Sequence, residues 1–260
     1  MHLAVAQIKP FNPILGETFQ AKIGNSNFYV EMTSHHPPIF NFLYTGENYR
    51  VHGYNESEVS SGANSLKAKY KGNYVVEFKN GVTHHVYFPE FRLTGMLFGN
   101  RSINYEGNLV IVDEENDLIS YIMMNPDERG FFQKMFTKKK SNYPDFFKGF
   151  ITFISKNAKF DKKEKSYTIT DLNKHILSNI EGEYSNHIKF DNEIFWEKDK
   201  LEHPKYKRMG FTLPSDSTFR EDIQWMRKEN TDMAQKEKIK LEEIQRSDKK
   251  LRERFRKTKK

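Results

Sequence analysis

The chain has 260 residues, of which 37% are hydrophobic and 30% charged, a composition that suits a soluble globular protein with a buried core. It has no cysteine, which excludes disulfide bonds and thiolate metal sites and fits a reducing, cytoplasmic compartment. No signal-peptide pattern follows Met1 and no apolar run is long enough to cross a bilayer, so we expect any membrane contact to be peripheral.

The net charge of +7 is concentrated at the C-terminal end of the chain. Residues 236–260 hold 12 Lys/Arg against 5 Asp/Glu, which leaves 30 basic and 30 acidic side chains elsewhere. Such a segment can approach anionic lipid or nucleic acid, or it can simply be a solvated helix end. Because no nucleic-acid-binding motif accompanies it and the rest of the chain is neutral, we expect no nucleic-acid partner.

The first motif in chain order is K-P-F-N-P-I-L-G-E, which begins at Lys9. Its prolines favour an extended, turn-rich segment, so Lys9 and Asn12 stand beside backbone that cannot be helical. A lysine ammonium is a point charge with three donors and suits a phosphate. Taken alone, the segment favours a structural turn with a surface lysine over a phosphate site.

A long series of short strands follows, separated by turn residues such as Asn80-Gly81. The candidates are residues 28–32, 39–44, 66–70, 74–78, 82–88, 109–112, 118–124 and 149–154. Aromatic residues, which favour strands, make up 14% of the chain. Many short strands with tight turns predict an antiparallel sheet closed into a barrel or a sandwich.

The run Ser34-His35-His36-Pro37-Pro38 interrupts this series. Proline pushes the residue before it toward extended geometry, so His36 is not helical and the strand over 28–32 must end or bend there. Two imidazoles at such a corner can donate hydrogen bonds to an anion, and each can gain a proton near neutral pH.

Residues 221–256 contain neither proline nor glycine and are rich in good helix formers. A candidate cap at Asn230-Thr231-Asp232 leaves open two helices or one interrupted helix, lying on the sheet with its far end in solvent. Lys238, Glu242 and Arg246 follow at intervals of four and share one helix face. They form either an intrahelical ion-pair ladder or two cations oriented by a carboxylate toward a polyanionic group.

Taken together, these motifs resemble the lipid-binding domain of the oxysterol-binding protein family. Glu31 to Pro38 (E-M-T-S-H-H-P-P) matches six of the eight positions of the family's E-Q-V-S-H-H-P-P. Arg129-Gly130-Phe131-Phe132 resembles its R-G-W-F, and Leu213 to Arg220 resembles its L-P-x-D-S-R-x-R. Residues 237–246 (E-K-I-K-L-E-E-I-Q-R) resemble its closing helix motif. The matches run in the family's order along nearly the whole chain.

The resemblance implies a non-enzymatic lipid carrier: a mainly β fold with C-terminal helices, built as an incomplete antiparallel β-barrel around an apolar tunnel. Residues 1–220 would form the barrel, and residues 221–260 a helical segment with a basic tail packed on it. The ligands implied are phosphatidylinositol 4-phosphate, exchanged between membranes for a sterol or phosphatidylserine, with no cofactor, metal or obligate protein partner. The implied headgroup residues are Lys9, Asn12, His35, His36, Lys238, Glu242 and Arg246.

Family members usually carry a lid and further elements before the first motif, whereas only eight residues precede Lys9 here. We therefore expect one end of the tunnel to be open, which leaves room for a phosphoinositide sensor or non-transferring fragment as an alternative. Peripheral association with organelle membranes is expected in either case. A metal-dependent hydrolase using the His pair is a remote alternative, because adjacent side chains of a strand point to opposite faces and chelate poorly.

Overall fold

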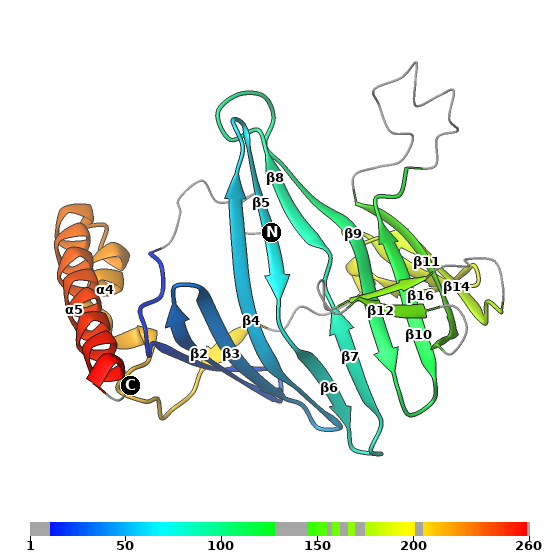
Figure 1. Ribbon diagram of the computed structural model, residues 1–260, viewed down its shortest axis with the longest axis horizontal. Helices are drawn as coiled ribbons and strands as arrows, with labels where there is room; N and C mark the ends of the chain where they lie inside the picture. Colours follow the sequence, from blue (N-terminus) through cyan, green and yellow to red (C-terminus); the bar gives the residue numbers. More distant parts are fainter. Residues whose placement is uncertain are drawn as a thin grey trace.

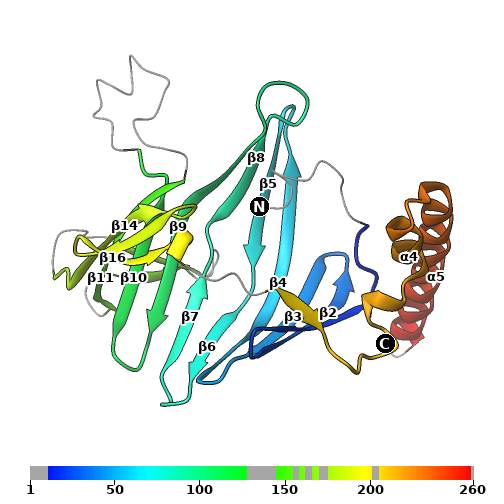
Figure 2. The same cartoon turned by 180° about the vertical axis from the view of Figure 1, so that it is seen from behind.

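The computed structural model describes residues 11–127, 145–154, 158–161, 166–169, 175–200 and 205–258. They form one curved 15-stranded antiparallel sheet, a separate two-stranded hairpin and two helices at one end of the sheet (Figures 1 and 2). The main path runs β16-β15-β14-β11-β10-β9-β7-β6-β4-β3-β2-β1-β17, while β5 and β8 bridge β4 to β9. The predicted mainly β fold with C-terminal helices is confirmed.

The strands have the following bounds: β1 Thr18–Ile23, β2 Ser26–His35, β3 Pro38–Thr45, β4 Tyr49–Ser61, β5 Ser65–Lys71, β6 Tyr74–Phe78, β7 Thr83–Tyr87, β8 Glu90–Thr94, β9 Ser102–Asp113, β10 Leu118–Met124, β11 Phe146–Phe153, β12 Ala158–Asp161, β13 Ser166–Ile169, β14 Ser178–Glu183, β15 His187–Phe190, β16 Glu193–Glu197 and β17 Tyr206–Arg208. The helices are η1 Lys198–Lys200, η2 Ser217–Phe219, α4 Glu221–Arg227 and α5 Thr231–Thr258.

Alternation along the central strands builds the largest core cluster. Val110 and Val112 of β9 share a face with Ile119 and Tyr121 of β10 and with Phe150 of β11. Tyr121 lies opposite both Val110 and Phe150, so the three strands are locked in register on this face. The β12–β13 hairpin covers the cluster, and each fully buried side chain of this size contributes about 1.5–3 kcal/mol.

The predicted strands are found, two with their predicted bounds (β6 and β10) and the others one to several residues different. The strands predicted from the sequence did not include β4, which is the longest strand of the sheet. Its sequence is mostly polar, and Gly53 interrupts it with a φ of 153°. A Cβ at Gly53 would lie 1.7 Å from the carbonyl oxygen of Asn73, so a glycine is required where these two backbones meet.

The strand that leads into the His pair does not stop at Met32. β2 continues to His35, and the expected bend appears as a register shift between Met32 and Ser34. His35 still pairs with Pro38 of β3, so the two prolines form a tight corner and do not end the sheet. The bend therefore lies inside the strand, three residues before the position the sequence suggested.

The C-terminal region forms two helices, which settles the alternative left open by the sequence. Asn230 caps α5, because its side chain accepts from the backbone N–H of Met233 at 3.0 Å. Ala234 and Glu237 are buried on the inner face, whereas every described side chain from Arg246 onward is exposed. Within the described part of the chain, no helix has the length and apolarity needed to span a membrane.

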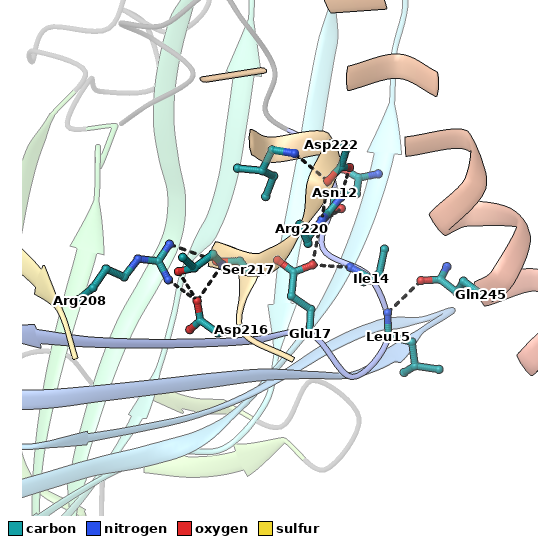
Figure 3. A network of polar contacts seen from close by, with 12 residues as sticks. Asn12, Ile14, Leu15, Glu17, Arg208, Asp216, Ser217, Arg220, Asp222 and Gln245 are labelled. Carbon is teal, nitrogen blue, oxygen red and sulfur yellow. Dashed lines mark hydrogen bonds and ion pairs between the residues drawn. The ribbon is translucent and has the colours of Figure 1, made fainter. Parts of the chain in front are cut away.

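A buried arginine joins the start of the chain to the helices. The guanidinium of Arg220 donates to both carboxylate oxygens of Asp222, at 3.0 and 2.6 Å, and to Glu17 Oε2 at 2.6 Å (Figure 3). It also donates to the carbonyl oxygen of Asn12 at 2.9 Å. Glu17 in turn accepts from the backbone N–H of Ile14. One side chain thus fixes the turn before β1 against the start of α4.

We expect Arg220→Met to lower the free energy of unfolding by about 3–5 kcal/mol, because two carboxylates would remain buried without their cation. Urea denaturation measures the change. Arg50→Met is the matched control, since the Arg50–Glu77 pair is solvent-exposed and its loss should leave stability unchanged. Equal behaviour of the two variants would contradict this role of Arg220.

Candidate functional site

A pocket of about 560 Å³ opens between the segment before β1, the β2–β3 corner and one face of α5. Its lining includes six of the seven residues predicted from the sequence: Asn12, His35, His36, Lys238, Glu242 and Arg246. Lys9 lies outside the described residues, as does the 129–132 motif. The segment before β1 and helix α5, more than 200 residues apart in the sequence, thus line the same pocket.

The His pair forms one wall of the pocket. His35 is half-buried and His36 is exposed, and their rings meet edge to face with centroids 4.4 Å apart. Burial, followed by the neighbouring His36, lowers the pKa of His35 below its usual 6.5, although Glu242 opposes this shift. The lowered pKa favours the neutral ring at pH 7, and an anion beside the ring would raise that pKa.

The opposite wall is a ladder of charges on α5. Lys238 Nζ lies 2.9 Å from Glu242 Oε1, and Arg246 Nη2 lies 3.5 Å from Glu242 Oε2. The hydrogen bond from Lys238 is the main cause that lowers the pKa of Glu242. The ion-pair ladder is therefore present, and all three of its side chains line the pocket.

The lining of the pocket includes two residues to which the sequence assigned no role. Arg220 reaches it from the buried network, and Gln245 accepts a hydrogen bond from the backbone N–H of Leu15 at 2.9 Å (Figure 3). This bond spans the gap between the N-terminal turn and α5. Both residues lie inside family-like motifs, but their structural role depends on contacts more than 200 residues apart, which spacing does not reveal.

The pocket continues along α5 past Arg246. Lys249, Arg252 and Glu253 also line it, and Lys249 lies 3.9 Å from Glu253. Their spacing from Glu242 by seven, ten and eleven residues places them on the same helix face, a signal the sequence did carry. Their charge keeps the outer part of the pocket basic.

Among the described residues, no group of three or more His, Asp or Glu side chains is placed to hold a metal ion. The described residues therefore lend no support to the hydrolase alternative.

Comparison with known proteins places these features in a family. The family model described as oxysterol-binding protein matches residues 2–260. Oxysterol-binding protein 9 of Dictyostelium discoideum is 31% identical over 254 residues, covering 96% of this chain and 58% of the relative. Oxysterol-binding protein-related protein 8 of Mus musculus is 26% identical over 261 residues, covering 92% of this chain and 26% of the relative.

Two solved structures share the fold. The Osh3 ORD in complex with PI(4)P from Saccharomyces cerevisiae matches with a TM-score of 0.69 at 20% identity, covering 94% of this chain and 64% of that one. The Osh1 ORD domain in complex with cholesterol matches with a TM-score of 0.68 at 19% identity, covering 98% and 64%. The chain thus spans less than two thirds of the length of each of these proteins. It belongs to the oxysterol-binding protein family.

Proposed function

We propose that this chain is a non-enzymatic lipid-binding and lipid-transfer module that holds phosphatidylinositol 4-phosphate by its headgroup. The observation that carries the proposal is the convergence of the His pair with Lys238 and Arg246 in one pocket. These side chains come from a β corner and from a helix nearly 200 residues later in the chain. All four can donate hydrogen bonds to phosphate oxygens.

The carboxylates of the pocket do not oppose this assignment. Glu242 is shared by Lys238 and Arg246, and Glu253 lies beside Lys249, so each is neutralised by a neighbouring cation. Glu242 thereby holds the two cations in place, which reduces the entropy lost when a ligand binds. With Arg252 added, the α5 side of the pocket keeps a net positive charge.

The comparisons support the choice of ligand. The similar Osh3 domain was solved with PI(4)P and the similar Osh1 domain with cholesterol. We therefore assign the phosphoinositide to the polar pocket and propose its exchange for a sterol or phosphatidylserine held by apolar surface of the sheet. The exchange would take place between organelle membranes that the protein meets peripherally from the cytoplasm, on anionic lipid.

His35→Ala/His36→Ala should weaken binding to phosphatidylinositol 4-phosphate about 100-fold or more, because two donors to a charged group are lost. Flotation with liposomes that carry the lipid measures this. His84→Ala/His85→Ala is the matched control, since these adjacent histidines lie on β7 and do not line the pocket. Unchanged binding in the first variant would refute the site.

Binding should strengthen as pH falls toward the pKa of His35. The pKa of His35 is lowered in the ligand-free protein and would be higher in the complex, where the ring lies beside a phosphate. Affinity should therefore increase as the pH falls from the pKa of His35 in the complex toward its pKa in the free protein. Titration calorimetry with inositol 1,4-bisphosphate in buffers of different ionisation enthalpy measures the proton taken up. The His35→Gln variant should take up fewer protons on binding. The ligand's own titration contributes equally for both proteins, so equal proton uptake would contradict the prediction.

Lys238→Ala should lower the affinity for inositol 1,4-bisphosphate about tenfold or more, since it removes a cation and leaves Glu242 facing the phosphate. Lys240→Ala is the matched control on the same helix, because Lys240 pairs with Glu237 at 2.6 Å and does not line the pocket. If both variants bound equally well, the helix would not form part of the headgroup site. Calorimetry again supplies the measurement.

A further inference from the structure

A short loop between β8 and β9 presents three consecutive apolar side chains to solvent. Met96, Leu97 and Phe98, here called the 96–98 tip, follow Gly95 and precede Gly99. Leu97 is 79% exposed and Phe98 is 69% exposed. Adjacent apolar side chains exposed to this degree are not explained by packing within the described fold.

The tip is held in one shape by a single residue of the neighbouring hairpin. The side-chain oxygen of Asn64 accepts from the N–H groups of Leu97 and Phe98, at 2.8 and 3.2 Å. Its amide nitrogen donates to the carbonyl oxygen of Phe98 at 2.9 Å, and its own carbonyl accepts from Gly95 at 3.1 Å. The loop between β4 and β5 thus clamps the loop between β8 and β9.

Gly95 completes the clamp. It adopts a φ of 72°, and a Cβ there would lie 2.2 Å from the carbonyl oxygen of Asn100. The backbones at Gly95 and Asn100 therefore approach too closely to leave room for a side chain at residue 95. The hydrogen bonds with Asn64 fix the backbone of the tip, which reduces the ordering cost of presenting its apolar side chains outward.

The tip lies at the same edge of the sheet as the pocket and projects beyond it. Ile39, next to the His corner, pairs with Glu56 of β4, and β4 then continues for five residues to Ser61. At about 3.3 Å per residue, this extension carries its end about 17 Å past the corner. Figures 1 and 2 both show the β4–β5 and β8–β9 loops standing beyond the ends of β2 and β3.

We propose that the 96–98 tip is a membrane-contact element that inserts into the interface of an anionic bilayer. The occupant follows from shape and charge: the tip is convex, so it fits a deformable medium better than a preformed groove. The exposed Arg101 follows it closely and would lie at the level of lipid phosphates. This contact goes beyond the headgroup pocket and does not depend on which lipid that pocket holds.

Sedimentation with vesicles of phosphatidylcholine and phosphatidylserine, without phosphoinositide, tests the proposal. Leu97→Ser/Phe98→Ser should lower the partition coefficient at least about tenfold, since two apolar side chains no longer leave water. Ile194→Ser/Phe195→Ser on β16 is the matched control, because these adjacent residues are also exposed, at 55% and 79%. Equal loss in both variants, or none in the tip variant, would overturn the proposal.

Insertion depth gives a second, independent readout. Phe98→Trp should be quenched by brominated acyl chains of the same vesicles, whereas Phe195→Trp should not; equal quenching would overturn the proposal. Inositol 1,4-bisphosphate binding separates the two assignments, because the tip variant should bind it with wild-type affinity. Vesicle binding through the tip by a protein that fails to bind inositol 1,4-bisphosphate would support the tip and refute the headgroup pocket.

Discussion

The buried guanidinium of Arg220 is the interaction on which the pocket depends. It faces two carboxylates, so the network of Glu17, Arg220 and Asp222 has an excess of negative charge. Backbone donors compensate for it: Glu17 accepts from Ile14, and Asp222 accepts from Ile223 in the first turn of α4, where the helix dipole also favours an anion. The guanidinium held in this way joins the segment around Asn12 to the start of α4. The pocket lies between that segment, the β2–β3 corner and α5.

Much of this site could be predicted from local sequence. Two prolines after His36 dictate a corner, and intervals of four place Lys238, Glu242 and Arg246 on one helix face. The meeting of these segments could not be derived from spacing, because it depends on bonds such as that from Leu15 to Gln245, 230 residues apart. Only the family resemblance suggested it. β4 was missed for a different reason: its polar residues and Gly53 hide a strand that neighbouring strands stabilise.

If the pocket binds a phosphorylated headgroup as proposed, its side chains would suit a ligand that is both bound and released. A pocket of lysines and arginines alone would be strongly repulsive when empty and would hold a phosphate tightly. Here Glu242 pairs with both Lys238 and Arg246, and burial lowers the pKa of His35, which a phosphate beside the ring would raise. The carboxylates therefore offset part of the positive charge of the pocket, which keeps a cationic excess. If the pocket holds a phosphate as proposed, the charge on His35 would arise with the ligand and disappear when the ligand leaves, which would lower the cost of release.

The position of the 96–98 tip would affect how the pocket meets a membrane. In the proposed assignment, one lipid headgroup bound by cations that carboxylates partly offset would give a modest affinity for a membrane. A second contact at the same edge of the sheet, joined to the first through Asn64 and β4, would make headgroup capture effectively intramolecular once the tip had bound. Selectivity would then reside in the pocket and attachment in the tip. Because the two binding energies would add in the bound state but be lost in separate steps, each contact could stay weak and the protein could still leave the surface.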